Sequence, residues 1–168
     1  MDLDTTETDG RQTLMPVYLV WDGATLLNAP VRIAWPYVVN YASWQSYSIV
    51  QNVSGRVGSE GEVVLLKKEE EGFAFPPYLA RTIKLEPEKR IIWKTYPEQG
   101  NDYFGIVDFR VQEISGKTRF SYSLLYEFMI PERSDEDLEK FRTQQYAATE
   151  ALFAAVLPKL HNLTNQRA

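Results

Sequence analysis

One long amphipathic stretch, residues 134–163, limits the folds open to this 168-residue chain. Ser134 is a typical helix N-cap residue, and Asp137 occupies the position from which a capping-box carboxylate reaches back. Pro158 removes one backbone donor, so we expect a bend near it. Mostly apolar residues recur every three or four positions, which predicts one apolar face on a helix roughly 44 Å long: Leu138, Phe141, Gln145, Ala148, Leu152, Val156, Leu160 and Leu163.

A helix of that length with one polar face needs a broad apolar surface to lie on, and the upstream residues are predicted to supply it as strands. Asn28-Ala29-Pro30 begins a short helix, which Pro36 kinks or breaks into two pieces ending near Trp44. The later strands are joined by short turns, which is typical of an antiparallel meander. We predict seven strands, at residues 17–27, 46–53, 62–71, 78–85, 90–96, 102–114 and 118–130.

Composition places the chain among globular proteins that form one domain. Hydrophobic residues make up 44% of the sequence, and the length suffices for a proper core. We expect a domain at residues 16–163, between an N-terminal tail (1–15) and a short C-terminal tail (164–168). The absence of cysteine removes disulfides, thiolate metal ligands and a thiol nucleophile.

Charge and hydropathy exclude several classes of partner. The net charge of -5 argues against nucleic acid. No apolar run approaches the about 20 residues of a membrane span, so we expect no integral membrane segment. The N-terminus is acidic and polar, which is the opposite of a signal peptide, and we therefore expect a cytoplasmic protein.

The order of a strand, short helices, six strands and a long helix resembles the START / Bet v 1-like (SRPBCC) superfamily. Its polyketide cyclase/dehydrase-like and general ligand-transport branch is the most similar. The resemblance implies an α+β helix-grip fold, in which a curved antiparallel sheet wraps around the long C-terminal helix. It also implies a cavity between sheet and helix for apolar ligands. The matching segments are the NAP at residues 28–30, Trp44, GRVGSEGEV, EPEKRIIWKTY and ISGKTRFSYS.

We expect no cofactor and no metal site. The oxygenase branch of the superfamily would need several metal-binding histidines, and His161 is the only histidine here. Because it lies beyond Pro158 near the end of the chain, we expect it at the surface or helix terminus.

Aromatic residues are the main functional signal, at 13% of the sequence. Buried tyrosines need hydrogen-bond partners, so several of them on inward faces suit a cavity with a partly polar ligand better than a dry core. Plain core packing is the alternative for each. The aromatic residues predicted to line the cavity are Trp35, Tyr47, Trp93, Tyr103, Tyr122 and Phe141.

Three polar residues interrupt predicted apolar faces, namely Arg81, Gln51 and Gln145. We predict that they line a polar end of the cavity. If Arg81 points inward, the acidic or polar head of a ligand is its expected counter-charge. The alternative is that the strand frays or bulges and Arg81 faces solvent. Asp108 is out of phase with the apolar residues of its strand, so solvent exposure is expected for it.

Three functions are compatible with these features. The first is a carrier or sensor of a small hydrophobic or aromatic ligand, lipid-like or polyketide-like. The second is a metal-free cyclase/dehydratase-type enzyme, in which Arg81, Tyr122 or an acidic residue transfers a proton; it would show an ionisable group with a perturbed pKa in the cavity. The third is a chaperone-activator-like interaction module, which would show a filled core and an exposed apolar patch. The oligomeric state is not indicated.

Overall fold

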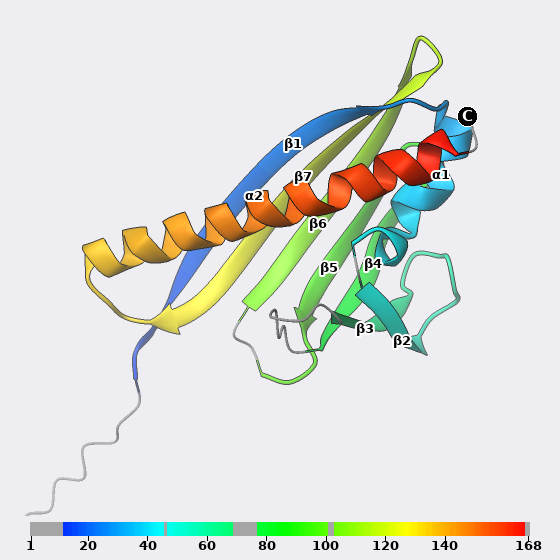
Figure 1. Cartoon of the computed structure of the whole chain (residues 1–168). Coiled ribbons are helices and arrows are strands. Elements are labelled where there is room, and N and C mark those ends of the chain that lie inside the picture. The colour runs from blue at the N-terminus through cyan, green and yellow to red at the C-terminus, as the bar shows by residue number, and fades with distance from the viewer. Residues whose placement is uncertain (1–11, 46, 69–76, 101–102, 167–168) are drawn as a thin grey trace, which may run out of the picture.

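Seven strands form one antiparallel sheet, and a long helix lies across one of its faces (Figure 1). The structure, a computed structural model, describes residues 12–45, 47–68, 77–100 and 103–166. This is the predicted α+β helix-grip arrangement. The elements in chain order are β1 (Leu14–Leu27), α1 (Val31–Val39), the 3-10 helix η1 (Tyr41–Ser43), β2 (Tyr47–Ser54), β3 (Val63–Lys68), β4 (Tyr78–Glu86), β5 (Arg90–Pro97), β6 (Tyr103–Ile114), β7 (Lys117–Pro131) and α2 (Asp135–Asn165).

The strand order β1-β7-β6-β5-β4-β3-β2 confirms the meander, with β1 added beside β7. The β6–β7 hairpin turns at Ser115 and Gly116, which both have positive φ (52° and 75°), as a tight two-residue turn requires. β1 begins at Leu14 instead of residue 17, because Leu14 and Met15 continue the ladder with the end of β7. The rest of the predicted tail up to residue 11 lies outside the described residues, as do residues 46, 69–71, 102 and 167–168 of the predicted elements.

Helix α2 begins at the predicted cap. The backbone N–H of Asp137 donates to Ser134 Oγ (3.2 Å), and the Ser134 hydroxyl donates to the Asp137 carboxylate (2.8 Å). The helix continues through Pro158 to Asn165, so the first residues of the predicted C-terminal tail are helical. Thr164 is fully buried there, and its hydroxyl donates to the Leu160 carbonyl at 3.1 Å.

The core lies between the C-terminal half of α2 and the sheet face that this helix covers, which we call the inner face. Phe153 of α2 packs on Trp21 of β1 and Tyr122 of β7, with ring centroids 4.4 and 4.5 Å apart respectively. Trp21 and Tyr122 stack at 5.1 Å. Gly23 lies opposite Tyr122 in the β1–β7 ladder, and a Cβ at Gly23 would overlap the tyrosine ring. These contacts hold helix and sheet together at this end.

Helix α1 closes the same end of the core. Its buried residues are Val31, Ala34 and Val38, and it packs beside α2 (Figure 1). The Trp44 indole N–H donates to the Tyr37 carbonyl at 3.0 Å, which closes the turn after α1. Pro30 is the N-cap of α1 and not its first helical residue, one position from the expected boundary. Among the described helices, none is long and apolar enough to cross a membrane.

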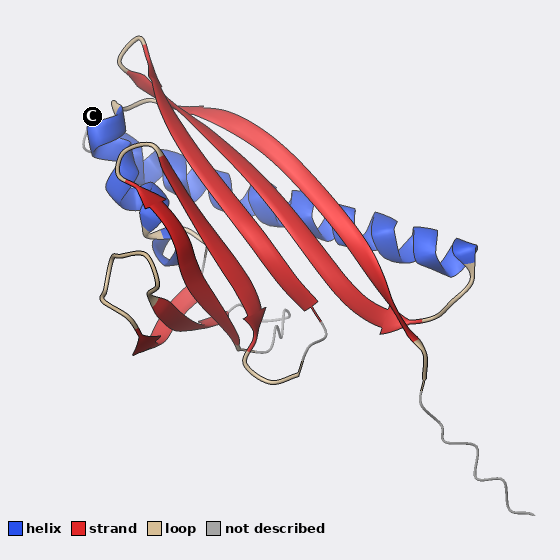
Figure 2. Cartoon of the chain, turned by 180° about the vertical axis from the view of Figure 1, so that it is seen from behind, coloured by secondary structure: helices blue, strands red, loops and turns tan. Residues whose placement is uncertain are grey.

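The opposite face of the sheet, which we call the outer face, carries no helix in the described part of the chain (Figure 2). Asp108 of β6 lies on this face and accepts hydrogen bonds from Arg90 of β5 (2.9 and 2.8 Å) and from Arg110 (2.7 Å at its shortest). The predicted exposure of Asp108 is wrong, because the two guanidinium groups cover it and leave 9% of the residue exposed. Burial raises the pKa of the Asp108 carboxyl, but these hydrogen bonds outweigh burial and hold it below its usual value.

This depressed pKa predicts an acid-sensitive contribution to stability. Because the folded-state pKa of Asp108 is below its unfolded value, the contribution is full above pH about 4 and is lost as pH falls through the folded-state pKa. We expect Asp108→Asn to be less stable than wild type at pH 7 and the difference to shrink below pH about 4. Urea unfolding across pH 2–7 measures this. A constant difference at every pH would contradict the role given to the carboxylate.

Candidate functional site

The candidate site lies between the N-terminal half of α2 and the inner face of β6 and β7. Toward the C-terminus of α2, Phe153, Val156 and Leu160 are at most 2% exposed. In the N-terminal half the sheet-facing residues are only half-buried, although they continue the same stripe: Leu138, Phe141, Gln145, Thr149 and Leu152. The helix is therefore packed closely on the sheet at one end and stands over accessible side chains at the other.

Aromatic side chains of the sheet lie beneath this accessible half of the helix. The Phe141 ring meets Phe128 of β7 edge to face, with centroids 5.5 Å apart. Phe128 is also near Tyr103 of β6 (6.1 Å, stacked) and Tyr126 (6.0 Å). All four residues are half-buried. We call Tyr103, Tyr126, Phe128 and Phe141 the aromatic cluster; it offers flat apolar surface and two phenol groups.

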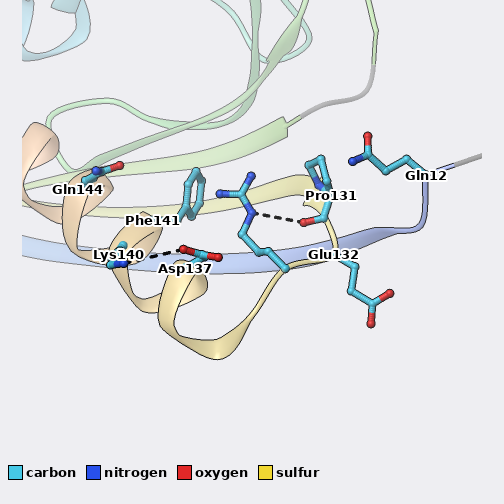
Figure 3. A pocket seen from close by; sticks show the side chains of 8 residues that line it. Gln12, Pro131, Glu132, Asp137, Lys140, Phe141 and Gln144 are labelled. Carbon is cyan, nitrogen blue, oxygen red and sulfur yellow. Dashed lines mark hydrogen bonds and ion pairs between the residues drawn. The ribbon is translucent and has the colours of Figure 1, made fainter.

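An open hollow of about 500 Å³ adjoins this cluster at the start of α2 (Figure 3). The guanidinium of Arg133 lies 5.8 Å from the centroid of the Phe141 ring, and its Nε donates to the Pro131 carbonyl (3.4 Å). The hollow therefore joins apolar surface to charged groups of both signs, an arrangement suited to a ligand with an apolar body and a polar head. Its lining residues are Gln12, Pro131, Glu132, Arg133, Asp137, Lys140, Phe141 and Gln144.

Two of the predicted site residues, Tyr103 and Phe141, come together here around Phe128, and Gln145 is half-buried one helical turn after Phe141. Tyr122 and Trp93 are 7% and 5% exposed and belong to the packed core. The Trp93 ring packs edge to face on Phe109 at 5.2 Å. Trp35 is half-buried on α1 and packs against the same core, while the side chain of Tyr47 lies outside the described residues.

Arg81 and Gln51 are exposed, so neither lines a polar end of a cavity as predicted; for Arg81 the alternative, a side chain that faces solvent, holds. In β4 up to Thr82 the inner face is formed by the even-numbered residues, because Thr82 lies opposite the buried Trp93 in the ladder, and Arg81 points to the outer face. Leu79 shares the outward phase of Arg81, and Ile83 lies in the register shift that follows Thr82, so neither residue marks the inward face. β2 is a terminal strand with two register shifts, and Ile49 and Val53 beside Gln51 are 57% and 48% exposed.

Phe128 and Arg133 are site residues that the sequence reasoning missed. The alternation of apolar and polar residues along 118–130 places Phe128 on the same face as Tyr122, yet it does not say which of the two lies under the accessible half of the helix. Arg133 stands in the short β7–α2 connection, where no periodicity applies, and its contact with Phe141 depends on the path of that turn.

The ionisable groups of the inner face include a buried tyrosine and the single histidine. Burial raises the pKa of the Tyr122 phenol, so this group stays protonated at neutral pH and does not act as a base. His161, the only histidine, forms a hydrogen bond through its Nε2 with Thr25 Oγ1 at 2.9 Å. Among the described residues, no group of three or more histidine or carboxylate side chains could hold a metal ion.

Comparison with known proteins identifies the fold. No protein-family model matches the chain, and no curated protein matches its sequence. Solved structures match well: the protein of unknown function SA2116 from Staphylococcus aureus has a TM-score of 0.70 at 8% identity, covering 90% of this chain and 96% of that one. The Zhui aromatase/cyclase from Streptomyces sp. R1128 has a TM-score of 0.65 at 16% identity, with the same coverage of 90% and 96%.

A third similar structure is Ara h 8.0201, with a TM-score of 0.58 at 10% identity over 86% of this chain and 98% of that one. The architecture of this protein is therefore the Bet v 1-like helix-grip fold, as the sequence resemblance implied. At these identities the likeness establishes the fold alone.

Proposed function

We propose that this protein binds a small hydrophobic or aromatic ligand between the inner face of the sheet and the N-terminal half of α2. It acts as a carrier or sensor. The ligand is lipid-like or polyketide-like, with its apolar body on the aromatic cluster and its polar head at the hollow beside Arg133.

One observation carries this proposal, the change of burial along the sheet-facing side of α2. Phe141 and Phe153 both meet rings of β7 from α2, but Phe153 is 2% exposed against Tyr122 while Phe141 is half-buried against Phe128. A folded domain gains by burying such aromatic surface, so a stripe left accessible over more aromatic rings favours an added apolar molecule. The partly polar rim fits the usual pattern of ligand sites.

The similar structures leave a cyclase as the alternative. One of them is an aromatase/cyclase, an enzyme with the same fold. A cyclase would need an ionisable group tuned toward neutral pH at the site. Among the described residues of the inner face, burial moves the pKa of the Tyr122 phenol away from neutrality. Binding without chemistry is therefore the simpler function for this arrangement.

Titration with an uncharged aromatic fluorophore, N-phenyl-1-naphthylamine, tests the site. We expect its fluorescence to rise on binding and fatty or aromatic compounds to displace it. Phe141→Ala removes one ring of the aromatic cluster and should weaken binding by about 1 kcal/mol, roughly fivefold.

Tyr18→Ala is the matched control, because Tyr18 is a large aromatic residue that is 56% exposed on the outer face. Its affinity for the fluorophore should equal that of wild type. Equal weakening in both variants, or no binding to wild type, would reject the proposed site.

A further inference from the structure

A second hollow, of about 400 Å³, lies on the outer face where β5, β6 and β7 meet, on the opposite side of the sheet from α2. Basic side chains dominate its lining: Lys89, Arg90, Arg110 and Arg119. Glu86 is the acidic residue of the lining, and Asp108 bridges two of the arginines. Four cations against two carboxylates leave an excess of two positive charges, in a chain whose net charge is -5.

The two central arginines are held in fixed positions. Arg90 and Arg110 lie directly opposite each other in the β5–β6 ladder, where like charges repel. Each binds Asp108 through its Nε and Nη2 atoms, with Nη2 distances of 2.8 and 2.7 Å. One carboxylate is thus shared by two guanidinium groups. In both arginines the Nη1 group is left to donate elsewhere, and one positive charge is not neutralised.

A third arginine extends this arrangement along the neighbouring strand. Arg119 of β7 alternates with the buried Phe120 and so lies on the outer face, opposite Gln112 of β6. Among the described residues it forms no ion pair. Ser121, opposite Arg110 in the same ladder, adds a hydroxyl to the lining. Glu86 is paired with Lys84 at 3.4 Å, which leaves less of its charge for the arginines.

We propose that this hollow binds a phosphate-type oxyanion, the terminal phosphate of a soluble compound or of a lipid headgroup. Guanidinium groups match the geometry of tetrahedral oxyanions and bind them through paired N–H donors. Two guanidiniums fixed by Asp108, with Arg119 and Ser121 beside them, supply such donors around one hollow. This second site is independent of the ligand site on the inner face.

The test uses pyrophosphate as the soluble probe and phosphatidic acid in phosphatidylcholine vesicles as the lipid probe. Calorimetry at fixed ionic strength measures pyrophosphate binding, and flotation measures vesicle binding against vesicles of pure phosphatidylcholine. Arg119→Gln leaves the Arg90–Asp108–Arg110 contacts intact and should weaken binding of the recognised probe by about tenfold or more. Arg142→Gln, an exposed arginine on α2, is the control with the same loss of charge and should bind as wild type does.

The outcomes separate the two sources. Pyrophosphate binding that depends on Arg119 identifies a soluble phosphate compound, and flotation that depends on phosphatidic acid and Arg119 identifies a headgroup; either supports the site. Equal weakening by Arg119→Gln and Arg142→Gln would mean a general charge effect and would overturn the proposal. Failure of both probes to bind wild type would overturn it as well. None of these outcomes changes the binding that we expect of the uncharged fluorophore at the inner face.

Discussion

Replacing Phe153 with alanine is expected to lower the free energy of unfolding by about 3–5 kcal/mol, the range for deleting a buried phenyl ring. Phe153 is 2% exposed and contacts both Trp21 and Tyr122, so its removal leaves a cavity between helix and sheet. The C-terminal half of α2 would lose its main anchor to the sheet. Urea unfolding followed by circular dichroism measures the loss.

Phe141→Ala is the comparison on the same helix. Because Phe141 is only half-buried, its replacement should cost clearly less stability than that of Phe153, while it weakens ligand binding. A loss from Phe141→Ala as large as that from Phe153→Ala would mean that the N-terminal half of α2 is packed as tightly as the other half. The difference in burial on which the binding site rests would then be wrong.

Gly23→Ala is expected to be the second most damaging change, with a loss of about 1–3 kcal/mol from overpacking. The added methyl group would overlap the Tyr122 ring, which cannot move freely because it packs against both Trp21 and Phe153. The cause is steric, so a smaller partner should relieve it.

A double-mutant cycle tests this cause. Gly23→Ala combined with Tyr122→Leu should lose less stability than the sum of the two single changes, since residues in contact are coupled. Strict additivity in thermal or urea unfolding would show that the ring of Tyr122 is not what excludes a side chain at residue 23.

The elements of the fold could be predicted because each has a local signal. Ser134 and Asp137 mark the start of α2, and they form the expected cap. Ser115 and Gly116 mark the β6–β7 turn, and both adopt the positive φ that the turn requires. The period-two pattern of residues 118–130 identifies the inner face of β7 correctly, from the buried Phe120 to Leu124.

The candidate site was predicted only in part, because it depends on how far the helix stands from the sheet. Phe141, which the helical periodicity marks as inward, is only half-buried, whereas Phe153, which it does not mark, is fully buried. Arg81 was misplaced because a short strand with a register shift has no reliable phase, and its flanking apolar residues, Leu79 and Ile83, are not inward markers. The pairing of Asp108 with Arg90 joins residues on adjacent strands, which single-strand periodicity cannot show.

The most direct test of the central claim is a titration of isotope-labelled protein with N-phenyl-1-naphthylamine, followed by two-dimensional NMR of aromatic and methyl groups. The account predicts that chemical-shift changes concentrate on the aromatic cluster, at Tyr103, Tyr126, Phe128 and Phe141. Exposed apolar residues of the outer face, such as Tyr18 and Val20, should be unaffected. Shifts concentrated on Tyr18 and Val20 would contradict ligand binding between sheet and helix, and would favour an interaction module that uses the outer face.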